Sequence, residues 1–220
     1  MKSIFITGCD TEIGKTFVSL GLAISQYSKG LKVGYFKPLQ SGAIQKNDKL
    51  SVPDVDEFNN FPYIKTKYSH LFKGEISPHL ACLLNNIEVD INKIKEDFID
   101  FSKDFDLTII EGAGGLYCPA FKGNLFSDVI KYLNQEIIIV STPHLGRLNH
   151  LLMTIECAKL NNIKIKGIII NKMPKNPTLS EENFINEFQK FSNAKILGVI
   201  PQLEKFSEEK IIECFRGIEL

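Results

Sequence analysis

The decapeptide GCDTEIGKTF, residues 8–17, decides the fold of this 220-residue chain, because it directly follows the apolar run at residues 4–6. A glycine-rich loop between a strand and a helix, closed by Gly-Lys-Thr, is typical of phosphate-binding loops. The common pattern GxxxxGK[ST] has four residues between its glycines, whereas five residues separate Gly8 from Gly14. The order of strand, loop, Gly-Lys-Thr and helix nevertheless predicts that backbone N–H groups of this loop bind phosphate.

Apolar runs rich in β-branched residues alternate with segments of helical period along the rest of the chain. Strands are expected at residues 3–7, 32–36, 107–111, 136–141, 165–171 and 195–200. Helices are expected at residues 17–27, 78–84, 91–101, 125–133, 148–160, 181–191 and 208–215. Nearly continuous apolar strands are typical of parallel sheets. The alternation therefore predicts one α/β domain over 1–220, with a doubly wound, mainly parallel sheet flanked by helices, of the P-loop NTPase type.

Residues 42–76 interrupt this alternation. The segment is polar, contains Pro53 and Pro62, and has no clear periodicity. We expect it to form an excursion above the sheet.

The composition argues against several classes of partner. Basic and acidic residues are equal at 26 each, without a strongly basic or acidic segment, so neither a nucleic-acid partner nor a membrane partner is expected. The five cysteines are scattered and never spaced as CxxC, which favours free thiols in a cytoplasmic protein. The four histidines form no HExxH or similar pair, so the sequence gives no support for zinc chemistry.

Polar residues follow the expected strands at the edge where the carboxyl ends of parallel strands meet, which is where such sheets bind ligands. Lys15 in the loop supplies a positive charge, and the hydroxyl of Thr16 is available to magnesium. Lys37 follows the second expected strand, beside the loop. Glu111 ends the third strand and resembles the magnesium-holding carboxylate of P-loop enzymes.

Four further residues have alternative interpretations. Either Asp54 or Asp56 is a candidate for a second magnesium carboxylate, although Asp54 after Pro53 is also placed to cap a helix. Asn171 and Pro201 follow the last two strands, where they fit a purine edge and an apolar wall as well as ordinary turns.

Several motifs, in the same order along the chain, resemble the dethiobiotin synthetase family of biotin biosynthesis. They are GCDTEIGKT at 8–16, Lys37-Pro38 with Ser41-Gly42, Ser77-Pro78-His79, EGAGGLYCP at 111–119 and LGRLNH at 145–150. The family's own phosphate loop has the five-residue spacing.

The resemblance implies an ATP- and Mg²⁺-dependent cyclo-ligase that joins CO2 to 7,8-diaminononanoate. In the family, a carbamate forms on one amine, ATP converts it to a carbamic-phosphoric anhydride, and the second amine closes a cyclic urea with release of phosphate. It also implies a homodimer with the substrate at the subunit interface.

Matching of motifs transfers the family's site residues onto this chain. Lys37 and Lys15 are implied as catalytic, and Thr16, Asp54 and Glu111 as magnesium ligands, with Asp54 favoured over Asp56 by its distance after Ser41-Gly42. The ATP-binding residues are implied to be Glu12, Ile13, Gly14, Lys15, Thr16, Phe17, Asp54, Glu111, Gly112, Ala113, Gly114, Asn171, Lys172, Pro201, Gln202 and Leu203. Those implied to bind the diamine are Thr11, Lys37, Ser41 and Gly114, with Leu145, Gly146 and Asn149 acting across the two-fold axis.

ATP-driven switches of the partition and membrane-positioning type are the alternative class on a similar scaffold. Their loop carries a signature lysine where this chain has Asp10. The C-terminal stretch is mildly amphipathic but acidic at its start, unlike a membrane-binding helix.

Overall fold

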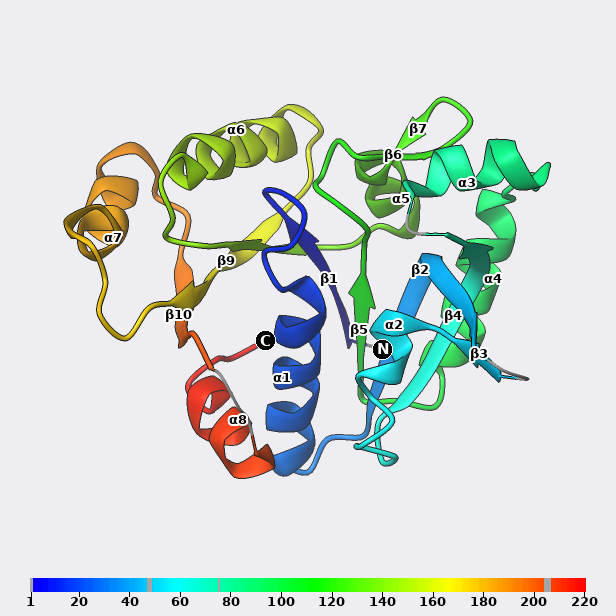
Figure 1. Cartoon of the computed structure of the whole chain (residues 1–220), viewed down its shortest axis with the longest axis horizontal. Helices are drawn as coiled ribbons and strands as arrows, with labels where there is room; N and C mark the ends of the chain where they lie inside the picture. The colour runs from blue at the N-terminus through cyan, green and yellow to red at the C-terminus, as the bar shows by residue number, and fades with distance from the viewer. Residues whose placement is uncertain (1, 47–48, 75, 204–206) are drawn as a thin grey trace.

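The computed structural model describes residues 2–46, 49–74, 76–203 and 207–220, and a twisted parallel sheet runs through its middle (Figure 1). Within the described residues, seven strands run parallel in the order β10-β9-β8-β1-β5-β2-β4. The strands of the sheet are β1 (Lys2–Gly8), β2 (Val33–Lys46), β3 (Lys49–Ser51), β4 (Lys65–Lys73), β5 (Leu107–Glu111), β8 (Ile137–Ser141), β9 (Ile165–Met173) and β10 (Ile196–Pro201). The short β3 pairs antiparallel with the end of β2, and a separate hairpin joins β6 (Pro119–Phe121) to β7 (Asn124–Leu125).

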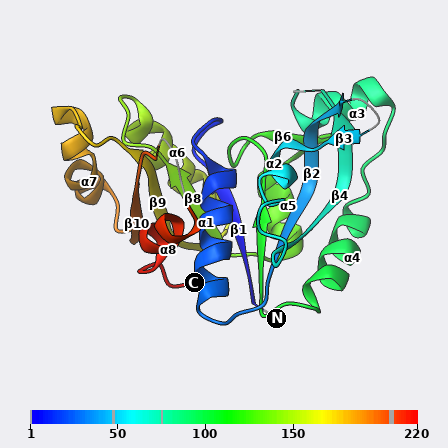
Figure 2. The same ribbon diagram turned by 60° about the horizontal axis from the view of Figure 1, so that its bottom comes forward.

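Helices cover both faces of the sheet, as the doubly wound prediction requires. The helices are α1 (Lys15–Ser28), α2 (Pro53–Asp56), α3 (Pro78–Asn85), α4 (Ile91–Ser102), α5 (Phe126–Leu133), α6 (Arg147–Leu160), α7 (Leu179–Phe191) and α8 (Glu208–Phe215). Figure 2 shows α1 and α8 on one face and α4 to α7 on the other. None of the described helices is long and apolar enough to cross a membrane.

Alternation along the central strands divides the core between these two faces. In β1, Ile4 and Ile6 pack with the α1 and α8 residues, while Phe5 packs with α4 and α5 on the opposite face. Successive side chains of a strand point to opposite sides of a sheet, so a strand buried on both sides is apolar throughout. This is why these strands read as continuous apolar runs.

The path of the chain places a ligand-binding edge beside β1. After β1 the chain moves through β2 and β4 toward one edge, returns to insert β5 beside β1, and then crosses to β8 on the other side of β1. The carboxyl ends of β1, β5 and β8 thus lie where the direction of winding reverses, the position at which open α/β sheets bind ligands. The loop at residues 8–17 leaves β1 at this point.

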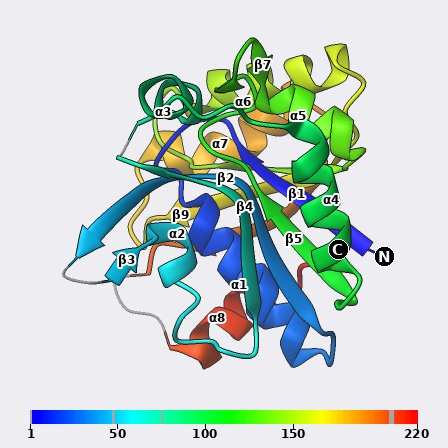
Figure 3. The ribbon, with the colours of Figure 1, turned by 90° about the vertical axis from the view of Figure 1, so that its right-hand side faces the viewer.

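The expectation of an excursion at residues 42–76 is wrong in its main feature. The segment ends in β4, an edge strand of the sheet that pairs in parallel with β2 from Gly34↔Lys65 onward (Figure 3). β4 is polar because most of its side chains are only half-buried at the sheet edge. Residues 52–64, which include the four-residue helix α2, connect β3 to β4 outside the sheet.

β2 is also longer than the five residues expected. It continues to Lys46 because β4 supplies a partner for it after its ladder with β5 stops at Phe36↔Ile110. Pro38 lies past that last β5 pairing, so its missing N–H breaks no bond on that side. Lys37 therefore lies within a strand, yet beside the carboxyl end of β5.

The C-terminal helix α8 packs along α1. Phe215 lies against Gly21, where an added Cβ would be 2.3 Å from the ring, so a glycine is needed at this crossing. The same ring meets Phe17 edge-on, with 5.9 Å between ring centroids. The carbonyl of Phe215 accepts a hydrogen bond from the Ser25 hydroxyl at 3.1 Å.

Candidate active site

The loop between β1 and α1 is held in its conformation by β9. Glu12 and Gly14 have φ angles of 56° and 83°, in the left-handed region that favours glycine. The side-chain amide of Asn171 donates to the Ile13 carbonyl at 2.9 Å, and Lys172 Nζ donates to the Glu12 carbonyl at 2.7 Å. A Cβ on Gly14 would lie 2.3 Å from Asn171 Nδ2. The end of β9 and the loop therefore form one rigid unit.

Helix α1 begins at Lys15 with its first N–H groups directed toward the loop. No side chain caps this end and no acidic residue lies in the first turn, so the positive end of the helix is available to an anion. Lys15 Nζ donates to the Asp10 carbonyl at 3.2 Å. Burial lowers the pKa of Lys15, with Glu111 opposing that effect and Lys37 adding to it.

A buried cluster of charges lies beside this helix start. Lys37 on β2 forms ion pairs with Asp54 of α2 and with Glu111 of β5, the latter at 3.1 Å. The Thr16 hydroxyl lies 3.1 Å from Asp54 Oδ1 and 2.9 Å from Glu111 Oε1. A single hydroxyl proton serves only one of these carboxylates at a time. Four residues predicted from the sequence thus meet at one point.

The two carboxylates keep Lys37 charged. Burial opposes the charge of Lys37, but attraction by Glu111 and Asp54, with their hydrogen bonds, raises its pKa above the ordinary value. For Asp54, burial raises the pKa, but Lys37 outweighs it and the net shift is downward. Lysine and carboxylate are consequently both ionised at neutral pH.

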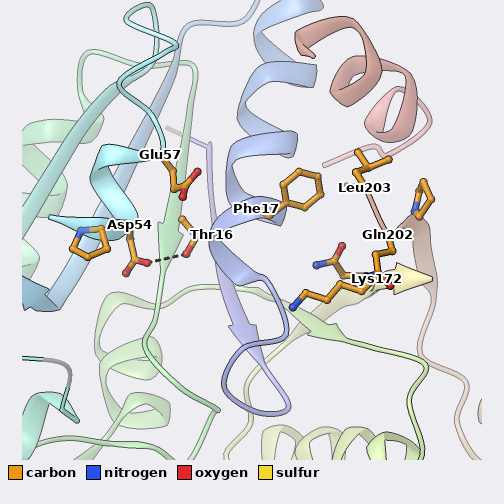
Figure 4. A pocket seen from close by; sticks show the side chains of 10 residues that line it. Thr16, Phe17, Asp54, Glu57, Lys172, Gln202 and Leu203 are labelled. Carbon is orange, nitrogen blue, oxygen red and sulfur yellow. Dashed lines mark hydrogen bonds between the residues drawn. The ribbon is translucent and has the colours of Figure 1, made fainter. Parts of the chain in front are cut away.

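The structure distinguishes between Asp54 and Asp56. Asp54 points toward Thr16 and Lys37, as Figure 4 shows for Thr16. Asp56 instead accepts hydrogen bonds from the Ser51 hydroxyl at 2.7 Å and the Val52 N–H at 2.9 Å. Asp56 therefore stabilises the start of α2, while Asp54 belongs to the charge cluster.

Two residues of this cluster gave no signal in the sequence. The Tyr35 hydroxyl, fully buried, donates to Glu111 Oε2 at 3.0 Å, and Gln40 Nε2 donates to Asp54 Oδ2 at 3.1 Å. In the sequence, Tyr35 lies within an apolar strand, and this pattern predicts only a core residue. Burial, followed by the charge of Glu111, raises its pKa well above the ordinary value, so its hydroxyl stays a donor.

The donor set fits magnesium held jointly with phosphate. Mg²⁺ takes one or two carboxylates, hydroxyls, waters and substrate phosphate oxygens rather than an all-protein cage. Asp54, Glu111 and Thr16 provide two carboxylates and a hydroxyl at the helix end suited to phosphate. Among the described residues, no group of three or more His, Cys, Asp or Glu side chains is arranged to hold a metal by itself.

A cavity of about 440 Å³ opens from this cluster (Figure 4). It is lined by Thr16, Phe17, Pro53, Asp54, Glu57, Asn171, Lys172, Pro201, Gln202 and Leu203. The carboxylate and hydroxyl groups lie at one end, and Phe17, Lys172, Gln202 and Leu203 lie across from them. A polar end with carboxylate and hydroxyl groups and a partly apolar end are what a nucleoside triphosphate with its cation requires.

The far end of this cavity includes a buried acceptor. Asn171 Oδ1 is buried without a hydrogen-bond partner among the described residues, although its Nδ2 is engaged by the loop. A buried polar atom without a partner is costly unless a ligand or water completes it. Asn171 Oδ1 therefore has an acceptor capacity that no described residue uses.

A second cavity, of about 420 Å³, lies on the other side of the loop. Its lining includes Thr11, Gly114, Tyr117, His150 and Met153. Thr11 and Gly114 were predicted to contact the diamine, and the structure places both here.

The ion pairs of Asp10 join the phosphate loop to α6 at the rim of this second cavity. Asp10 pairs with Arg147, and its Oδ2 lies 3.3 Å from His150 Nδ1. Arg147 and His150 both belong to α6. The first turn of α6 is therefore anchored to the loop.

Other predicted residues do not line either cavity. Gly112 and Ala113 follow β5, with Gly112 N–H bonded to the Ile6 carbonyl at 3.1 Å. Ser41 lies on β2 and its carbonyl accepts a bond from Gln40 at 2.6 Å. Leu145, Gly146 and Asn149 lie at the start of α6, where Leu145 is 89% exposed.

Comparison with known proteins gives a consistent set of relatives. A protein-family model described as an AAA domain matches residues 2–210. The ATP-dependent dethiobiotin synthetase of Caldicellulosiruptor saccharolyticus is 36% identical, with 99% of this chain and 92% of that protein covered. The ATP-dependent dethiobiotin synthetase of Methanococcus vannielii is 35% identical, with 92% and 95% covered.

Solved structures resemble the chain in fold at much lower identity. The cell division ATPase MinD of Pyrococcus furiosus superposes with a TM-score of 0.61 at 17% identity, covering 99% of this chain and 96% of that one. At this identity the likeness shows the shared P-loop α/β architecture alone. The sequence relatives, by contrast, are similar over nearly their whole length.

Proposed function

This chain belongs to the dethiobiotin synthetase family, and from that premise we propose how its site carries out ATP-dependent ligation in biotin biosynthesis. The ligase activity follows from full-length similarity to the synthetases. The roles of individual residues are proposals, and the observation that carries them is the meeting of Lys37, Asp54, Glu111 and Thr16 at the start of α1.

The reaction brings two anions together. A carbamate formed from CO2 and one amine of 7,8-diaminononanoate attacks the γ-phosphoryl group of ATP, and ADP leaves. The second amine then attacks the carbamic-phosphoric anhydride, closes the cyclic urea and expels phosphate. Such steps depend on positioning and on fixed positive charge more than on an acid or a base.

Lys37 and Lys15 supply that charge. Lys37 is buried, ionised and within reach of the phosphate loop, so it is placed to stabilise both the carbamate and the transferring phosphoryl group. Lys15 lies at the helix start that receives the triphosphate, together with the N–H groups of residues 12–17. Gly112, Ala113 and Gly114 bring backbone close to the same phosphates.

Magnesium would be held by Thr16, Asp54 and Glu111. When bound, the ion neutralises phosphate charge and orients the triphosphate. Because Asp54 and Glu111 both pair with Lys37 in this structure, the ammonium group has to move away from them, toward the reacting anions, when they bind the cation.

The base of ATP would occupy the other end of the 440 Å³ cavity. Asn171 Oδ1 is an acceptor because Nδ2 is committed to the Ile13 carbonyl. An acceptor suits the exocyclic amine of adenine, whereas the carbonyl of guanine offers it no proton. Pro201, Gln202 and Leu203 form the wall against which the ring would pack.

The diamine would enter from the second cavity, beside Thr11 and Gly114. Ser41 and Lys37 on β2 approach from the side of the charge cluster. This arrangement separates the two substrates on opposite sides of the phosphate loop and brings their reactive ends together near Lys37.

A labelled-product assay tests the function. Purified protein is incubated with 7,8-diaminononanoate, ATP, Mg²⁺ and ¹³C-bicarbonate, and the products are analysed by mass spectrometry. We expect a product with the mass of the diamine plus one labelled CO2 minus water, released with ADP and phosphate. ATP hydrolysis without a labelled urea would support the alternative of a switch ATPase of the partition type and overturn the ligase function.

We also propose that the chain acts as a homodimer with the diamine at the interface. Met153 and Tyr117, which line the second cavity, are 58% and 45% exposed, and Leu145, just before α6, is 89% exposed. Clustered exposed apolar residues are typical of interfaces. The uncapped first turn of α6, beginning after Gly146 and including Asn149, suits a substrate carboxylate on a second subunit. A cytoplasmic location, without nucleic-acid or membrane partners, stays a prediction from composition.

Light scattering after size exclusion tests the dimer. The wild-type particle is expected at twice the 24.8 kDa chain mass. Met153→Glu places a charge in the proposed interface, so we expect monomers and a raised KM for the diamine. Leu160→Glu is the matched control, since Leu160 ends the same helix and is 80% exposed. Dimers unaffected by Met153→Glu, or a monomeric wild type, would contradict this interface.

A further inference from the structure

Tyr35 contacts Glu111 of the proposed magnesium site, but the reaction as proposed gives Tyr35 itself no role. Its hydroxyl donates to Glu111 Oε2 at 3.0 Å, inside the protein. The other oxygen of Glu111, Oε1, accepts hydrogen bonds from the Thr16 hydroxyl at 2.9 Å and from Lys37 Nζ at 3.1 Å. The two oxygens of the Glu111 carboxylate thus have different partners: Tyr35 for Oε2, and Thr16 and Lys37 for Oε1.

The register of the sheet explains why Tyr35 reaches this point. Tyr35 and Lys37 are two residues apart on β2, so both side chains project to the face covered by α1. Glu111 is two residues after Ile109 on β5, and Ile109 packs on the same face as Tyr35. β2 and β5 are neighbours in the sheet, with Tyr35 opposite Ile109. The hydroxyl therefore extends along β5 to the carboxylate.

The ring of Tyr35 is itself fixed. It stacks on Phe58 with 4.2 Å between centroids and an interplanar angle of 30°. Phe58 follows α2, the helix that carries Asp54. The fixed ring holds the hydroxyl oxygen in place beside Glu111.

We propose that Tyr35 is a positioning residue that holds Glu111 so that Oε1 faces the cation and phosphate. This inference rests on the proposed function, because it assumes that Glu111 binds magnesium. Partners behind a metal-ligating carboxylate restrict its rotation, and their loss typically costs 10- to 100-fold in metal affinity. Without the phenol, Glu111 Oε2 is a buried acceptor that loses this bond, and the carboxylate gains freedom to turn.

Binding of Mn²⁺ in place of Mg²⁺ tests the inference without relying on turnover. Free Mn²⁺ is measured by electron paramagnetic resonance in the presence of protein and a non-hydrolysable ATP analogue. For Tyr35→Phe, which keeps the ring and removes the hydroxyl, we expect about tenfold weaker Mn²⁺ binding. In turnover assays kcat should approach the wild-type value at saturating Mg²⁺, with the half-saturating Mg²⁺ concentration raised by a similar factor.

Tyr63→Phe is the matched control. It removes a phenol that donates to a different carboxylate, Glu208, at 2.5 Å on the surface. Its Mn²⁺ binding should equal that of wild type. Tyr35→Phe binding within twofold of wild type, or a lowered melting temperature with unchanged Mn²⁺ affinity, would overturn the positioning role while leaving the proposed function intact. Failure of the wild type to bind Mn²⁺ with the analogue would instead overturn the magnesium site and the inference together.

Discussion

Lys37→Gln is expected to lower kcat by about 100- to 1,000-fold while changing ATP affinity only a few-fold. Loss of one fixed charge or donor at a developing anion typically costs this much, equivalent to about 2.7–4 kcal/mol. Lys37 is buried, and its pKa is raised by its two carboxylate neighbours over the opposing effect of burial, so it is a permanent charge at neutral pH. Glutamine fills similar space but carries no charge. Steady-state kinetics and calorimetric titration with an ATP analogue measure the two effects separately.

Stability has to be controlled in this experiment. Removing Lys37 leaves Asp54 and Glu111 without a counter-charge, and breaking a buried ion pair typically costs about 3–5 kcal/mol. Added Mg²⁺ should recover part of that loss by binding the two carboxylates. Lys67→Gln is the matched control, because Lys67 pairs with Asp97 at 3.3 Å near the surface. Turnover within tenfold of wild type in folded Lys37→Gln would remove Lys37 from the mechanism.

Gly14→Ala is expected to weaken ATP binding by about 100-fold, or about 2.7 kcal/mol. Gly14 has a φ of 83°, and an added Cβ would lie 2.3 Å from Asn171 Nδ2. Alanine therefore forces the amide of Asn171 away from the Ile13 carbonyl, which disturbs the phosphate loop and the base-binding acceptor together. Titration calorimetry with ATP and Mg²⁺ measures the loss directly.

Gly30→Ala separates backbone strain from this clash. Gly30 also has a positive φ, 91°, but nothing lies within 4 Å of an added Cβ. Both variants carry the left-handed penalty of about 1–2 kcal/mol, which lowers the melting temperature by about 2–4 °C per kcal/mol in a chain of this size. Only Gly14→Ala should lose nucleotide affinity. Equal affinities in the two variants would show that the contact between Asn171 and the loop has no role in binding.

The central strands and the phosphate loop could be predicted because their signals are local. Burial on both faces gives β1, β5, β8 and β9 a run of apolar residues each, and Gly-Lys-Thr has few structural alternatives. β4 was missed because an edge strand is only partly covered, so its sequence KTKYSHLFK lacks an apolar run. A helix of four residues, such as α2, spans about one turn, so no apolar position can repeat often enough to reveal it.

In the candidate site, too, some residues could be predicted from the sequence and others could not. Lys37 and Glu111 are charged residues at the ends of apolar stretches, and a charge at the end of a buried strand indicates a binding residue. Tyr35 lies inside such a stretch, where an aromatic residue predicts only core packing, so its hydrogen bond to Glu111 could not be predicted. The positions at the start of α6 enter only through the family resemblance and the proposed dimer, because no local pattern in the sequence indicates a binding role for them.

The wall formed by Leu203 at the far end of the nucleotide cavity has an optical consequence. The chain contains no tryptophan. An indole placed at position 203 would be the sole tryptophan fluorophore of the protein and would lie in the wall against which the base is proposed to pack. Its emission would follow the arrival of the base alone, independently of phosphate release, ring closure or any coupled assay.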